Sequence, residues 1–170
     1  MKITSLTSLY QIVMNKEFSR DRLKMRESLL NANGKNLLPD DNDNLILKHL
    51  LITIAPNKSN YSISSFAKKI RIINAMLNKK LYKRKFKQHP NRIVFFNFIE
   101  YSKTKNLTHN HFIIRTHKSF SSTTKIIELM NLLKTIVDKF EFKFDYRFRN
   151  NAVDYATKHF SENNDNLIIN

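Results

Sequence analysis

The chain has 170 residues, of which 41% are hydrophobic and 13 are phenylalanine, enough apolar material to bury the core of one domain. Its 30 lysines and arginines outnumber 14 aspartates and glutamates, and the net charge of +16 indicates an acidic polymer, nucleic acid first of all, as partner. The absence of cysteine excludes disulfides and thiolate metal sites, and the single glycine, Gly34, excludes glycine-rich nucleotide-binding loops.

Residues 1–44 are predicted to form an N-terminal helical extension. Leu6, Tyr10 and Val13 begin a loose apolar stripe at helical spacing. Gly34 favours a helix end, and Pro39 with the acidic residues after it separates this segment from the rest of the chain.

Residues 45–161 are predicted to form one domain in which strands and helices alternate, followed by a polar, frayed tail over 162–170. The order strand, helix, strand, strand, helix, strand, helix favours an α+β fold of the ferredoxin-like (split βαβ) type, an antiparallel sheet with two helices on one face. The final helix, which carries Tyr155, is then free to cross the other face. The expected elements are a strand over Leu45–Ala55, a helix from Ser62, strands over 92–100 and 110–117, a helix capped by Ser121 or Ser122, a strand over Glu141–Phe148 and a helix over about 150–161.

A basic run ends the first helix of this domain. It lies near the start of the next strand, away from Glu100, which ends that strand. The run is either a solvated charge cluster or a contact surface for nucleic-acid phosphates. In a chain of this charge we predict DNA binding by Lys79, Lys80, Lys83, Arg84, Lys85 and Lys87.

Glu100, His109 and His111 are the candidate ligands of one divalent cation. Residues two apart in a strand share a face, so the two histidines point the same way. Hairpin pairing near Glu100 and His111 adds the carboxylate to that face. Two imidazoles and a carboxylate make a cation site with open positions, and this ligand chemistry does not exclude zinc.

Tyr155 is the candidate nucleophile. Val153, Ala156 and Phe160 form the apolar stripe of the last helix, and at about 100° per residue Tyr155 lies roughly opposite them. A tyrosine beside a cation site can attack an electrophile covalently. Lys158, one turn further on, is either a phosphate-binding residue or a surface lysine.

With these motifs, residues 45–161 resemble the HUH endonuclease superfamily, and most of all the single-tyrosine rolling-circle replication initiators (Rep proteins) of plasmids and small DNA viruses. His-Asn-His at 109–111 is similar to the family's His-x-His motif, Glu100 to its acidic ligand, and Tyr-Ala-Thr-Lys at 155–158 to its Tyr-x-x-Lys motif. One departure is Leu107, which lies one place further from the histidines than the family's usual hydrophobic residue.

The resemblance implies a metal-dependent endonuclease that nicks and rejoins single-stranded DNA to initiate rolling-circle replication of a plasmid or phage. Glu100, His109 and His111 would hold Mg²⁺ or Mn²⁺. Tyr155 would attack the phosphate to give a 5′-phosphotyrosyl link and a free 3′-hydroxyl, and Lys158 would hold the phosphate. The implied partners are single-stranded DNA at an origin or nick site and the host helicase and polymerase.

Two other functions fit the same residues. One is a single-tyrosine transposase or relaxase of the same superfamily, and the other is a non-catalytic nucleic-acid-binding module, since ferredoxin-like sheets also bind single strands. The first 30 residues carry charges throughout and no long apolar run follows, so we expect a cytoplasmic protein without a membrane segment.

Overall fold

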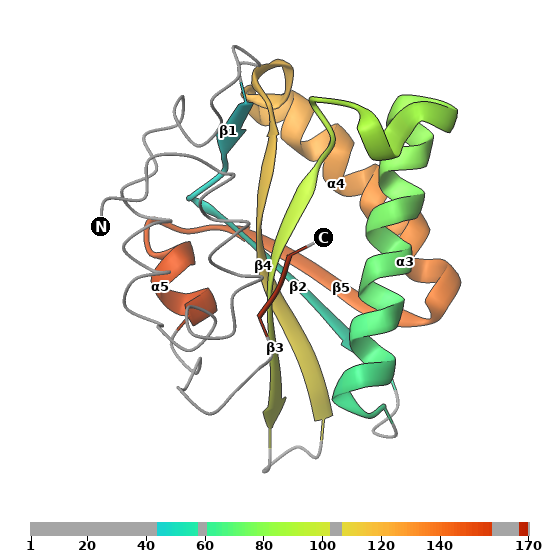
Figure 1. Cartoon of the computed structure of the whole chain (residues 1–170). Coiled ribbons are helices and arrows are strands. Elements are labelled where there is room, and N and C mark those ends of the chain that lie inside the picture. The colour runs from blue at the N-terminus through green and yellow to red at the C-terminus, as the bar shows by residue number, and fades with distance from the viewer. Residues whose placement is uncertain (1–43, 58–60, 103–106, 158–166, 170) are drawn as a thin grey trace, which may run out of the picture.

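A computed structural model of the chain describes residues 44–57, 61–102, 107–157 and 167–169. The described elements form an α+β fold around one antiparallel sheet (Figure 1). The strands are β1 (Asn44–Ile46), β2 (Leu50–Pro56), β3 (Val94–Ser102), β4 (Leu107–His117), β5 (Phe142–Phe148) and β6 (Leu167–Ile169). The helices are α3 (Ile63–Tyr82), α4 (Thr123–Val137) and α5 (Ala152–Thr157), with short 3-10 helices η1 (Lys83–Gln88), η2 (Lys118–Phe120) and η3 (Asp138–Phe140).

The sheet has the strand order β5-β2-β4-β3-β6, and β1 pairs with β4 outside this path. Every pairing is antiparallel. The α+β class and the antiparallel sheet expected from the sequence are therefore confirmed. Most predicted elements are present with shifted ends. For example, β3 and β4 extend further into their hairpin than the apolar runs indicate.

Helices α3 and α4 cover one face of the sheet, on the right in Figure 1. Each begins at a serine whose hydroxyl accepts a backbone N–H of the first turn, Ser62 for α3 and Ser122 for α4. Their apolar stripes pack on alternate residues of the central strands, which makes the larger core. Its fully buried side chains include Phe66, Ile70, Ile73, Leu77, Ile52, Ile54, Phe95, Phe112, Met130 and Leu133.

The other face of the sheet carries α5. This short helix contacts β2 and β4 and lies across the sheet from α3 and α4 (Figure 1). Val153 and Ala156, two residues of its predicted apolar stripe, are buried, whereas Tyr155 is half-buried. The third stripe residue, Phe160, lies outside the described residues.

The run predicted as one strand over Leu45–Ala55 is two strands, β1 and β2, and the prediction was wrong at this point. Five residues separate Ile46 from Ile52, but only two separate their partners Arg115 and Phe112 on β4. The extra residues form a turn in which the Leu50 amide donates to the Leu47 carbonyl at 3.1 Å. The uniformly apolar sequence conceals this turn because neither Gly nor Pro marks it.

The C-terminal tail was predicted to be frayed, but Leu167–Ile169 forms β6 and pairs with Phe96–Phe98 of β3. Three apolar residues suffice to add an edge strand when a long neighbouring strand offers unpaired backbone groups. The predicted N-terminal extension lies outside the described residues, apart from Asn44 in β1. Within the described part of the chain, no helix is both long and apolar enough to cross a membrane.

Candidate metal centre

The strand register places the three candidate ligands on one face of the sheet. Glu100 of β3 pairs directly with His109 of β4, and Phe98 pairs with His111. The pairing expected near Glu100 and His111 is thus displaced by two residues. A displacement of two preserves the side-chain alternation, so the carboxylate and both imidazoles still point to the same face. This is the face that α5 covers.

The ligand atoms of Glu100, His109 and His111 all lie within 4.8 Å of one another. Glu100 Oε2 is 3.1 Å from His109 Nε2, and the centres of the two imidazole rings are 4.8 Å apart. Two ligands of one ion lie at most about 4.6 Å apart when each bond is about 2.0–2.3 Å. The cluster therefore needs to contract only slightly to hold one divalent cation.

The burial of Glu100 supports a cation at this place. Only 7% of the residue is exposed, and the buried oxygen Oε1 accepts no hydrogen bond from the described residues. A buried carboxylate is costly unless a cation or hydrogen-bond donors compensate its charge. The His109 side chain remains 23% exposed, so solvent or a ligand can reach this cluster from one side.

Thr53 of β2 orients His111, and sequence reasoning missed it. The two residues are direct partners across β2 and β4, and Thr53 Oγ1 lies 2.9 Å from His111 Nδ1. With the proton on Nδ1, that nitrogen donates to the threonine hydroxyl, and Nε2 carries the lone pair that a metal ion requires. A hydrogen bond of this kind sets the tautomer and orientation of a metal-binding histidine. The signal in the sequence is a lone polar residue within an apolar strand.

Thr53→Val should weaken Mn²⁺ binding by about 10-fold or more, because the hydroxyl that fixes the His111 ring is lost at nearly constant volume. Calorimetric titration with Mn²⁺ measures the effect. Thr135→Val is the control, since the Thr135 hydroxyl is exposed on α4 and bonds only the Leu132 carbonyl among the described residues. Equal affinities in the two variants would contradict the role of Thr53.

Tyr155 of α5 lies against this cluster. The centres of the Tyr155 and His111 rings are 5.2 Å apart, and their planes meet at 80°, an edge-to-face contact. The Tyr155 amide donates to the Asn151 carbonyl at 2.9 Å, which fixes the residue in the first turn of the helix. The tertiary structure therefore brings a phenol beside the two histidines and the glutamate, from a segment more than forty residues away in sequence. Lys158, the other predicted catalytic residue, lies outside the described residues.

No protein-family model, curated protein or solved structure matches this chain.

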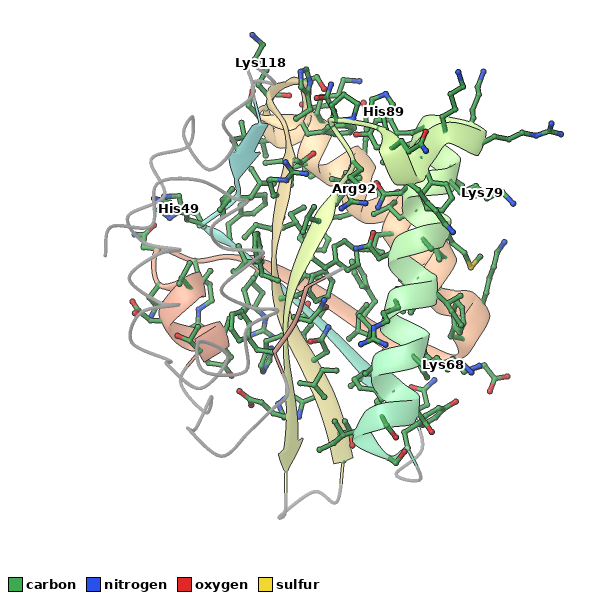
Figure 2. All side chains as sticks on the ribbon, viewed as in Figure 1. His49, Lys68, Lys79, His89, Arg92 and Lys118 are labelled. Carbon is green, nitrogen blue, oxygen red and sulfur yellow. The ribbon has the colours of Figure 1, made fainter. Side chains whose placement is uncertain are left out.

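The predicted DNA-binding residues lie at the other end of the sheet. They are exposed at the end of α3 and in η1, and they comprise Lys79, Lys80, Lys83, Arg84, Lys85 and Lys87, which together we term the basic segment. The strand β3 starts beside it at Val94, and Glu100 follows six residues later, roughly 20 Å away at strand rise. Figure 2 shows Lys79 and His49 on opposite sides of the sheet.

Hydrogen bonds of the buried Asn78 and the half-buried Tyr82 hold the basic segment in place. Asn78 of α3 accepts the Ile93 amide at 2.7 Å and donates to the Ile93 carbonyl at 2.9 Å. The Tyr82 hydroxyl donates to the Asn91 carbonyl at 2.6 Å, and its ring stacks on His89 at 4.1 Å. Burial raises the pKa of Tyr82, so its hydroxyl remains a donor. The segment is thus a fixed, positively charged surface that lies away from the candidate metal centre.

Proposed function

We propose that this protein is a metal-dependent endonuclease that nicks and rejoins single-stranded DNA through a covalent tyrosine intermediate. The observation that carries the proposal is the contact between the Tyr155 ring and the His111 ring, which joins a nucleophile to a candidate metal centre. A phenol, two imidazoles and a carboxylate on one sheet face are the groups that such a reaction requires. We propose that this nicking reaction initiates rolling-circle replication of a plasmid or phage.

We propose a ferredoxin-like, split βαβ arrangement for the domain that carries the site. The order of the central strands, β5-β2-β4-β3, supports it, as does the placement of α3 and α4 on a single face. In this arrangement α5 carries the nucleophile across the free face. The central strand β4 supplies both histidines, so the ligands rest on rigid backbone with a neighbour on each side.

Each residue has a definite part in the proposed reaction. Glu100, His109 and His111 would hold Mg²⁺ or Mn²⁺, which supplies polarisation of a phosphate oxygen when bound. The Tyr155 oxygen attacks phosphorus and loses its proton to solvent. The bond from phosphorus to the 3′-oxygen breaks, and that oxygen leaves as a free 3′-hydroxyl after taking up a proton. The DNA 5′ end stays on Tyr155 until a 3′-hydroxyl reverses the step.

The charge of the chain supports nucleic acid as the substrate. The net charge is +16, and the exposed basic segment adds a concentrated positive surface. Because the basic segment lies far from Glu100, it would bind DNA that flanks the cleaved bond. A host helicase and polymerase are the proposed further partners, because replication needs strand separation and extension of the 3′-hydroxyl.

The test is incubation of the purified protein with single-stranded DNA labelled at its 3′ end, with and without Mn²⁺. A labelled species that migrates with the protein on a denaturing gel, and only with Mn²⁺, is the expected result. Cleavage without such an adduct would mean that water is the nucleophile. Binding without cleavage, on DNA drawn from many sequences, would instead favour a non-catalytic nucleic-acid-binding module.

Replacing Lys83, Arg84 and Lys85 together with glutamine should reduce the salt dependence of single-strand binding. Each lost phosphate contact removes about 0.7 from the slope of log affinity against log salt, so the slope should fall by about 2. The cleavage position should not change. Lys68, Arg71 and Lys139, also exposed, provide a control variant with the same loss of charge. If both variants show the same slope, the basic segment does not bind DNA.

A further inference from the structure

We propose that Arg149 binds a phosphate group of the substrate beside the candidate metal centre. The inference rests on the proposed function and names the residue that holds the reacting phosphodiester next to Tyr155. No sequence motif indicates this role, because Arg149 is one of 30 lysines and arginines in the chain and belongs to no recognised pattern. Its position in the fold is what distinguishes it.

Backbone hydrogen bonds fix Arg149 at the corner between β5 and α5. Its amide donates to the His49 carbonyl at 2.7 Å, and its carbonyl accepts the Ala152 amide at 3.3 Å. The first bond ties it to the turn that separates β1 from β2, and the second ties it to the start of α5. The side chain therefore leaves a fixed point on the same sheet face as the metal centre.

The Arg149 guanidinium packs on the Tyr155 ring. Its central carbon is 4.4 Å from the ring centre, and the same ring centre is 5.2 Å from the centre of the His111 ring. The guanidinium and the metal-ligand imidazole thus contact one tyrosine and are separated by no more than the sum of these two distances. A phosphate attacked by the Tyr155 oxygen lies within reach of both groups.

The charge of Arg149 is available to such an anion. Among the described residues, no carboxylate pairs with it, and the side chain is only half-buried. A guanidinium stacked on an aromatic ring still presents N–H donors along its edge, in a fork that matches two phosphate oxygens. Arg147, two residues earlier, differs on both counts, because it is mostly exposed and pairs with Asp145 at 2.9 Å.

The first experiment needs no cleavage. Inorganic phosphate is added to the Mn²⁺-loaded protein, and the paramagnetic relaxation of its phosphorus nucleus reports phosphate next to the metal. Arg149→Ala should reduce this relaxation several-fold while leaving Mn²⁺ affinity unchanged, and Arg149→Lys should restore part of it. Arg147→Ala is the control and should resemble wild type.

The second experiment measures the covalent adduct with labelled single-stranded DNA. Arg149→Ala should slow its formation by about 100-fold, as expected when one donor to a reacting phosphate is removed, and Arg149→Lys should be intermediate. Phosphate relaxation that depends on Arg149, with no adduct in wild type, would retain the anion site and reject the proposed function. Phosphate relaxation absent in wild type, unchanged in Arg149→Ala, or lost together with Mn²⁺ affinity would overturn the inference.

Discussion

Tyr155→Phe is expected to abolish the covalent protein–DNA adduct completely, because only the phenolic oxygen can form the bond to phosphorus. The substitution removes one oxygen and little volume. The ring contacts with His111 and Arg149 involve the aromatic ring itself and should persist. The melting temperature, Mn²⁺ affinity and DNA affinity should therefore remain close to those of wild type.

A denaturing gel of reactions with Mn²⁺ and 3′-labelled single-stranded DNA measures this effect. Tyr146→Phe is the matched control, since Tyr146 lies on β5 and its ring contacts Phe144 and Phe148 rather than the metal centre. The control should form as much adduct as wild type. An adduct in Tyr155→Phe at the wild-type level would eliminate Tyr155 as the nucleophile.

His109→Ala and His111→Ala are each expected to reduce Mn²⁺ affinity by at least about 100-fold and to abolish cleavage at Mn²⁺ concentrations that just saturate the wild-type protein. Each removes one of three protein ligands from the candidate site, and the remaining two cannot hold the ion in the same geometry. His111→Ala also removes the ring on which Tyr155 packs, so it should impair adduct formation even at saturating Mn²⁺. His109→Ala should recover partly at high Mn²⁺.

Calorimetric titration with Mn²⁺, followed by cleavage assays over a range of metal concentrations, separates these effects. His117→Ala provides the control on the same strand, because His117 lies at the far end of β4 and bonds Ser119 instead. Zn²⁺ titration shows whether the site prefers the other ion that its ligands allow. Unchanged Mn²⁺ affinity in both variants would remove the metal centre from the proposal.

Side-chain periodicity was the most reliable guide in the sequence. A strand alternates its side chains with a period of two, so His109 and His111 had to share a face whatever strands lay beside them. The register with Glu100 was predicted two residues away from its observed position. The prediction of a shared face survived because a shift by an even number of residues preserves the alternation.

Local sequence was a poor guide where backbone pairing decided the structure. The turn between β1 and β2 lies in an apolar run without Gly or Pro. It exists because β4 pairs with both β1 and β2, and more residues separate those two strands than separate their partners on β4. The strand β6 similarly depends on β3, which offers backbone groups to three apolar residues of the tail. Such pairings join residues distant in sequence, and no local pattern encodes them.

The sequence by itself determined the basic charge, the order of the elements from β2 to α5, the shared face of the two histidines and the residue types of the candidate site. Only the tertiary structure decided that Tyr155 contacts His111, that Thr53 bonds the same histidine, and that Arg149 packs on the tyrosine. The physical reason is the range of the interactions. Periodicity and capping act within one element, whereas these contacts join β2, β4, α5 and the corner after β5 once the sheet has assembled.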